Sequence, residues 1–200
     1  MGDTGKKLLI TGFEPFGGET LNSSWEAVQK LPEQIRSYRL TKLRIPTVFG
    51  RGSEAVLRAA DELSPDVILC VGQAGNRAAV TPEVIGINLR ESRIADNDGN
   101  RPVNVPVCGE GPAAYFATVP VREMAAAVRK AGIESALSFS AGAYVCNDVF
   151  YTLLHRFHGT GTRVGFIHVP PAAEQAKEGR VCLPLEDIVK ALTEAVGALG

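Results

Sequence analysis

Cys146 is the residue whose type and setting best fit covalent chemistry. It follows a strand-like stretch, Ile133 to Phe139, and a turn of small residues, 140–143. Apolar residues then recur with the period of a helix that buries one face: Phe150, Leu153, Leu154 and Phe157. Asn147 and Asp148 are helix-capping residue types, so we expect Cys146 at or just before a helix N-terminus. Unpaired N–H groups and the macrodipole there favour a thiolate, which is a nucleophile.

A structural role for Cys146 is the alternative, because most cysteines are buried and act as small hydrophobic residues. The strand–turn–helix setting favours catalysis, since the same geometry exposes the nucleophilic serine of hydrolase elbows. A catalytic cysteine also needs a base within reach.

Among the three histidines, His168 is the candidate base. It closes the apolar strand predicted at 162–168 and is followed by two prolines. Ligands of open α/β sheets bind beyond the carboxyl ends of the strands, where Cys146 also lies, so the two side chains are expected to meet. His155 and His158 lie beyond the first turn of the helix after Cys146, which favours a structural role for both.

A third group should orient the imidazole, and Glu83 is the candidate. It stands in a stretch that is nearly free of charge, so its carboxylate is expected to be either ion-paired or functional. Arg77, Arg90 and Arg93 are near enough in sequence for a purely structural ion pair. The residues alone leave these two interpretations equal.

Composition limits the classes of function. The chain has 200 residues, a formal net charge of −1 and 45% hydrophobic residues, which indicates one domain, 1–200, with a single large core. The absence of a basic run argues against nucleic acid and anionic membranes as partners, and no apolar run is long enough to span a bilayer.

The four cysteines are far apart, with no CxxC pair and no Cys/His cluster, so we expect no metal site. Cys70 lies in an apolar run typical of a buried strand, which argues against a disulfide there, and residues 1–7 do not resemble a signal peptide. We therefore expect a cytoplasmic protein with reduced thiols. The sequence leaves the use of Cys70, Cys108 and Cys182 open.

Strands and helices alternate along the chain. Strands are expected at 7–11, 40–45, 66–72, 133–139 and 162–168, and a strand or hairpin at 80–89. Three helices are expected before Cys146: from a cap at Asn22 or Ser23 to Leu31, from a cap at Ser53 to Leu63, and from Pro120 to its stop at Gly132. Two more are expected after it, one from the Cys146 turn through Phe157 and one at 185–196. The weak pattern of 91–118, with a turn at 97–100, is typical of a lid or binding loop. This order predicts a single-domain α/β/α sandwich with a mainly parallel or mixed twisted sheet.

The glycine-rich segment 12–18 has two interpretations. It lacks both the Gly-Lys-Ser/Thr ending and the G-x-G-x-x-G spacing, so it is a poor phosphate loop. It instead presents Phe13 and Phe16, for which core packing is the default role.

Nearly the whole chain resembles the pyroglutamyl peptidase I (pyrrolidone carboxyl peptidase) family of cysteine peptidases. The matching stretches are TGFEPFGG at 11–18, NSSW at 22–25, IPTVF at 45–49, VGQAG at 71–75, TPE at 81–83, NDGN at 97–100, SAG at 140–142 with CN at 146–147, and GFIHVP at 165–170. Each stretch is weak alone, but their order and spacing together are specific.

The resemblance implies a Cys–His–Glu triad at Cys146, His168 and Glu83. The chain departs from the family pattern P-E-R-V-A-I-N, because Val84 and Gly86 replace the basic residue and the alanine. Pro171 also replaces a bulkier residue.

The implied activity is hydrolysis of an N-terminal pyroglutamyl residue through a thioester, without a cofactor. An apolar slot suits this substrate, because pyroglutamate is a neutral lactam. Phe13 and Phe16 are expected to clamp the ring, Asn22 and Gln73 to bind its amide, Ile94, Tyr144 and Val145 to line the pocket, and Arg93 to assist the oxyanion. The resemblance also implies a homodimer or homotetramer. The alternatives are a nucleoside-phosphorylase-like transferase, which would need a phosphate site, and a non-catalytic ligand-binding relative.

Overall fold

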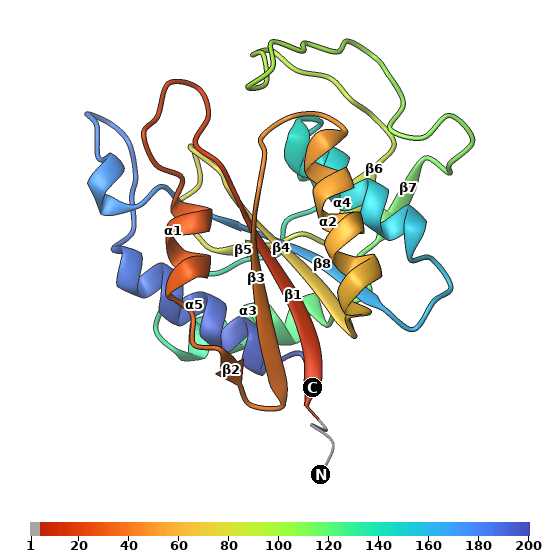
Figure 1. Ribbon diagram of the computed structural model, residues 1–200. Coiled ribbons are helices and arrows are strands. Elements are labelled where there is room, and N and C mark those ends of the chain that lie inside the picture. Colours follow the sequence, from red (N-terminus) through yellow and green to blue (C-terminus); the bar gives the residue numbers. More distant parts are fainter. Residues whose placement is uncertain (1–4) are drawn as a thin grey trace.

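The computed structural model describes residues 5–200 (Figure 1). Residues 1–4, which include most of the segment examined for a signal peptide, lie outside this range. The strands are β1 (Lys6–Phe13), β2 (Gln34–Ile35), β3 (Tyr38–Ile45), β4 (Val67–Gln73), β5 (Thr81–Pro82), β6 (Ile85–Ile87), β7 (Ala114–Phe116) and β8 (Arg163–Val169). The helices are α1 (Ser23–Lys30), α2 (Arg51–Leu63), α3 (Val121–Lys130), α4 (Val145–Arg156) and α5 (Leu185–Gly197), with a 3-10 turn at Ala173–Gln175.

The main sheet has the strand order β2-β3-β1-β4-β8-β5. Its four central strands are parallel, and the two-residue strands β2 and β5 pair antiparallel at the edges. The buried strand β4 lies between β1 and β8, as expected for a continuous apolar run covered on both faces. The mainly parallel, mixed sheet predicted from the sequence is therefore confirmed.

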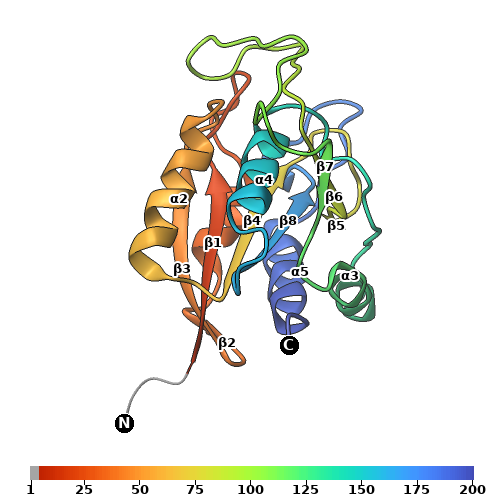
Figure 2. The same cartoon turned by 90° about the vertical axis from the view of Figure 1, so that its right-hand side faces the viewer.

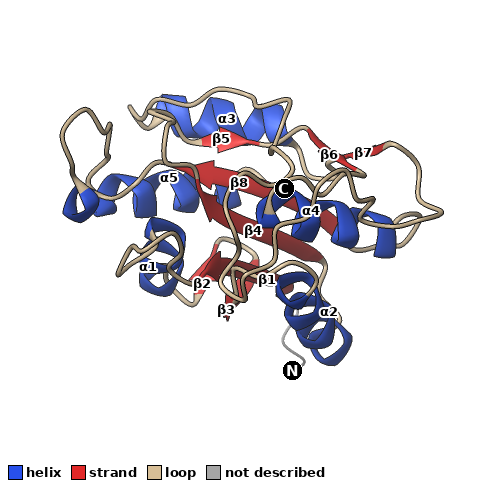
Figure 3. Cartoon of the chain, turned by 90° about the horizontal axis from the view of Figure 1, so that it is seen from above, coloured by secondary structure: helices blue, strands red, loops and turns tan. Residues whose placement is uncertain are grey.

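Helices cover both faces of the sheet, which makes three layers (Figures 2 and 3). Alternate residues along each strand point to opposite faces. Leu8, Ile10 and Leu69 pack with α1, α3 and α5, whereas Leu9 and Ile68 pack with α2 and α4. The predicted α/β/α sandwich is thus confirmed.

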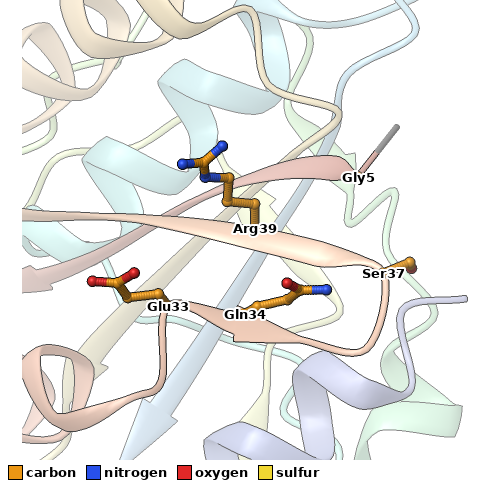
Figure 4. A pocket seen from close by; sticks show the side chains of 5 residues that line it. All are labelled: Gly5, Glu33, Gln34, Ser37 and Arg39. Carbon is orange, nitrogen blue, oxygen red and sulfur yellow. The ribbon is translucent and has the colours of Figure 1, made fainter. Parts of the chain in front are cut away.

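The loops that follow β1, β3 and β8 gather at one end of the sheet, together with the long 91–113 loop (Figure 1). This is the carboxyl end of the parallel strands, where ligands bind in open α/β sheets. A hollow lined by Gly5, Glu33, Gln34, Ser37 and Arg39 lies at the opposite end, beside the β2–β3 turn (Figure 4). None of the predicted site residues lines it.

Two predicted strands differ in the structure. Residues 133–139 make only isolated bridges, at Ser135 with Val80 and at Ser138 with Glu83, because the chain there runs along the outside of the short edge strand. The segment 80–89 is not a hairpin, since β5 pairs with β8 while β6 pairs with β7.

Helix starts were predicted less well than helix bodies. Gly50, rather than Ser53, is the N-cap of α2, and the Ser53 hydroxyl donates back to the Gly50 carbonyl from inside the first turn. Asn22 does cap α1, where its side chain accepts from the N–H of Ser24.

Across residues 5–200, no helix is long and apolar enough to cross a bilayer. Within the same range, no group of three or more His, Cys, Asp or Glu residues is arranged to hold a metal ion.

Candidate active site

Cys146 is the second residue of α4, and its sulfur lies against Gly72 of β4. A Cβ atom at Gly72 would be 2.9 Å from the cysteine Sγ and 2.9 Å from the Phe166 ring. Gly72 pairs in register with His168 on β8, so the imidazole projects from the same face of the sheet. The sheet therefore places the thiol and the imidazole side by side.

Glu83 reaches His168 from the opposite edge of β8. Thr81 of β5 pairs with His168, and the N–H of Glu83 donates to the carbonyl of Phe166. The carboxylate Oε1 lies 2.7 Å from the imidazole Nδ1, with Glu83 fully buried. This bond fixes the ring and leaves Nε2 to act on the thiol.

Arg77 is the second partner of the same carboxylate. Its Nη1 donates to Glu83 Oε1 at 2.6 Å, while Oε2 has no hydrogen-bond partner within residues 5–200. Burial works to raise the pKa of Glu83, but the hydrogen bond and charge of His168, the Ser138 side chain and, last, the charge of Arg77 hold it below its ordinary value. Glu83 is therefore both ion-paired and joined to the imidazole, which combines the two interpretations left open by the sequence.

The surroundings shift the pKa values of the thiol and the imidazole in opposite directions. Burial raises the pKa of Cys146 to about 12, and the charge of Glu83 adds to this. Burial likewise lowers the pKa of His168 below its ordinary value, although Glu83 opposes that shift. Desolvation of the sulfur therefore opposes the thiolate that the helix N-terminus favours. No hydrogen bond joins the thiol to the imidazole in the described part of the chain, so the two must approach further when substrate binds.

Tyr144, rather than Asn147 or Asp148, is the N-cap of α4, and it provides no side-chain cap. Asn147 instead donates to the carbonyls of Ile87 and Leu89. The carboxylate of Asp148 accepts from the Gly50 N–H and from Arg90. These two side chains anchor the start of α4 to neighbouring segments and leave its first N–H groups without a side-chain acceptor.

The aromatic residues predicted for the pocket divide into two groups. Phe16 packs against Tyr144, with ring centroids 6.1 Å apart, and both residues are only partly buried. Phe13 is almost fully buried and packs against Phe166. The ring centroids of Phe166 and His168 are in turn 4.8 Å apart. Phe16 and Tyr144 can therefore contact a ligand directly, whereas Phe13 lies in the core beside the triad.

The two predicted amides also differ in availability. Asn22 is committed locally, because it caps α1 and donates to the Glu14 carbonyl. Gln73 Oε1 accepts from the backbone and hydroxyl of Ser23, while no hydrogen bond engages its Nε2 in the described chain. Ser23 thus orients Gln73 with its donor still available.

The remaining predicted residues occupy different positions. Val145 is fully buried in the core between the sheet and α2, so it does not line an open pocket. Ile94 is 50% exposed and Arg93 is exposed, both in the loop that begins at 91. No contact in the structure brings Arg93 to Cys146 among the residues described.

Sequence reasoning missed the parts played by Gly72 and Ser23, and it considered Arg77 only as one of three possible ion-pair partners. A glycine inside a buried strand indicates a close approach by another group, which could have identified Gly72. Nothing in the local pattern distinguished Arg77 from the other two arginines.

Comparison with known proteins identifies the family. The pyroglutamyl peptidase family model matches residues 6–199. Pyrrolidone-carboxylate peptidase of Levilactobacillus brevis is 48% identical over 197 residues, which cover 96% of this chain and 97% of that protein.

Solved structures extend the similarity to the whole fold. Pyroglutamyl peptidase I from Bacillus amyloliquefaciens has a TM-score of 0.93 at 42% identity, covering 97% of this chain and 96% of that one. Pyrrolidone carboxyl peptidase from Thermococcus litoralis has a TM-score of 0.91 at 34% identity, covering 97% and 93%. The chain therefore belongs to the pyroglutamyl peptidase family, cysteine peptidases that remove an N-terminal pyroglutamyl residue.

Proposed function

We propose that Cys146, His168 and Glu83 form the catalytic triad that removes the pyroglutamyl residue. The observation that carries this proposal is the bond from Glu83 to His168 Nδ1, with the sulfur of Cys146 over the glycine that pairs with His168. Nucleophile, base and orienting group thus come from the start of α4, from β8 and from the residue after β5, in the order that the triad mechanism requires.

The raised pKa of Cys146 and the lowered pKa of His168 favour general-base catalysis. His168 Nε2 accepts the thiol proton as the sulfur of Cys146 attacks the pyroglutamyl carbonyl. The imidazolium is stabilised by Glu83, and it then gives the proton to the amine that leaves. The resulting thioester is hydrolysed by water, which His168 deprotonates in turn, and the thiol is restored.

The oxyanion forms beside the start of α4. The first N–H groups of this helix are free of a side-chain cap, and such groups are suited to bind an anion formed next to Cys146. One such donor contributes about 3 kcal/mol to catalysis. Arg93 is a further candidate donor if the loop that carries it folds over bound substrate.

The substrate ring is a neutral lactam, which suits an apolar slot, and we place that slot beside Phe16 and Tyr144. Phe13 lies deeper in the core, and Ile94 is exposed in the loop that begins at 91. The Nε2 group of Gln73 is a donor suited to the lactam carbonyl. A free N-terminal ammonium would lose its hydration here without gaining a counter-charge.

A set of chromogenic amides tests this assignment. The enzyme should release chromophore from the pyroglutamyl amide without added phosphate, and from prolyl or glutaminyl amides at no more than about a hundredth of that rate, since their ammonium would be unpaired. Equal cleavage of all three amides would indicate a general aminopeptidase. A requirement for phosphate would instead support a phosphorylase-like transferase.

We also propose that the enzyme works in the cytoplasm as a homodimer or homotetramer. A nucleophilic thiol has to stay reduced, and all four cysteines are free. Phe116 and Phe139 are 70% and 66% exposed, which fits a surface that is covered in an oligomer. Cell fractionation tests the cytoplasmic location, and sedimentation equilibrium tests the oligomer. A monomer at micromolar concentration would exclude the proposed homodimer and homotetramer.

A further inference from the structure

Arg77 joins three segments that meet at the triad. Its Nη1 donates to Glu83 Oε1 and to Thr81 Oγ1, each at 2.6 Å, and its Nη2 donates to the Ser140 carbonyl at 2.9 Å. Arg77 itself follows β4, Thr81 and Glu83 belong to the β5 edge, and Ser140 lies in the turn that leads to Cys146. One planar guanidinium therefore contacts the strand edge that carries the acid and the loop that carries the nucleophile.

The orientation of Glu83 depends on this contact. The carboxylate is fully buried, and Oε1 accepts from both Arg77 and His168 while Oε2 has no partner in residues 5–200. If Arg77 were removed, the carboxylate would keep His168 and the Ser138 side chain as neighbours but would lose its permanent cation. A buried carboxylate that loses its cation is less well fixed and less readily ionised.

We propose that Arg77 is a positioning residue for catalysis, which holds the Glu83 carboxylate against His168 and couples it through Ser140 to the loop before Cys146. Arg77 does not contact the reacting atoms, and its role rests on the proposed triad. The fixed fork of the guanidinium suits this role, because it presents separate N–H groups to the carboxylate and to the Ser140 carbonyl.

The structure supplies a matched control. Arg90 forms a second ion pair of the same kind, with its Nε 2.6 Å from the fully buried Asp148. The side chains of Arg77 and Arg90 are both 25% exposed. Arg77→Gln and Arg90→Gln should therefore lower the free energy of unfolding to a similar extent, because each leaves one buried carboxylate without its cation.

Arg77→Gln should alter the chemistry far more than Arg90→Gln, because Arg90 contacts Asp148 at the start of α4 and not a member of the proposed triad. We expect kcat to fall by about 10²-fold, the loss typical of misplaced catalytic groups, with KM changed by less than about threefold. The acid limb of the kcat/KM profile should move to higher pH, because the charge of Arg77 keeps the pKa values of Glu83 and His168 low. Arg77→Lys should restore the acid limb but only part of kcat, since it keeps the charge and loses the fork.

Chemical rescue tests the position directly. Arg77, Thr81, Leu137, Ser138, Phe139 and Ser140 line a hollow that opens on the guanidinium from outside. Methylguanidinium should therefore raise the kcat of Arg77→Ala in a saturable way, and tetramethylammonium at equal ionic strength should not. Methylguanidinium should not change the kcat of Arg90→Ala.

Two outcomes would overturn the inference. One is an Arg77→Gln variant with wild-type kcat and pH profile but reduced stability, which would make Arg77 purely structural. The other is an equal loss of kcat in Arg77→Gln and Arg90→Gln. A wild-type enzyme that is inactive on pyroglutamyl amides would refute the proposed function itself, which is a different result.

Discussion

Gly72 and Cys146 are so close that no side chain fits between strand β4 and the sulfur of Cys146. A Cβ atom at Gly72 would lie 2.9 Å from the sulfur, which is well inside van der Waals contact. Gly72→Ala should therefore displace the thiol, with about 1–3 kcal/mol lost from the free energy of unfolding and about a 10²-fold loss of kcat.

Urea unfolding and steady-state kinetics measure the two effects of Gly72→Ala. Gly75→Ala is the control, since its Cβ would make an ordinary contact 3.5 Å from Arg180. A fully active Gly72→Ala enzyme would mean that the thiol works from another position.

Cys146→Ser should remove turnover by several orders of magnitude while the fold is kept. A hydroxyl is a far weaker nucleophile than a thiol with the same base. Cys182→Ser, at a partly exposed cysteine, should keep full activity. If Cys146→Ser retained more than about a tenth of the wild-type rate, the thioester route would be wrong.

His168→Ala should abolish activity, whereas His155→Ala and His158→Ala should not. The wild-type acid limb should lie below the ordinary histidine pKa, because His168 must be neutral to accept the thiol proton and burial lowers its pKa. Activity should then be lost only as the pH falls through that lowered value. A pH–kcat/KM profile checks this, and an acid limb above the ordinary value would contradict the buried, neutral imidazole.

Glu83→Gln should lower kcat by about 10- to 10⁴-fold, by analogy with carboxamide substitutions in other triads. Glutamine matches the size of Glu83 but carries no charge to stabilise the imidazolium. Rapid kinetics measures the loss of kcat, and thermal unfolding measures any change of Tm in the same variant. An unchanged kcat with a lower Tm would reduce Glu83 to an ion-pair partner of Arg77.

Phe16→Ala and Phe13→Ala should differ, because one ring is partly exposed and the other is buried. Phe16→Ala should cost about 1–3 kcal/mol in kcat/KM with little change in stability. Phe13→Ala should cost about 3–5 kcal/mol in unfolding free energy, because it leaves a cavity beside Phe166. Alkylation of Cys146 by a small reagent should persist in Phe16→Ala, which would show that substrate recognition alone is impaired.

Much of the fold could be predicted from the sequence, because the apolar periodicity of each element follows from the face that it buries. The bodies of β1, β4, β8, α3 and α5 agree with the predicted ranges to within a few residues. The segment 133–139 could not be assigned correctly, since its strand-like residues lie beside an edge strand only two residues long. Its pairing depends on a tertiary neighbour that has no local signal.

The sequence alone determined the candidate nucleophile and base, because Cys146 and His168 each follow a strand and topology brings such positions together at the carboxyl edge. The match of ordered motifs also determined the family. Only the tertiary structure decided that Arg77, rather than Arg90 or Arg93, pairs with Glu83. It also decided that the pKa of the Cys146 thiol is raised, because desolvation and through-space charge depend on how the sheet and helices pack.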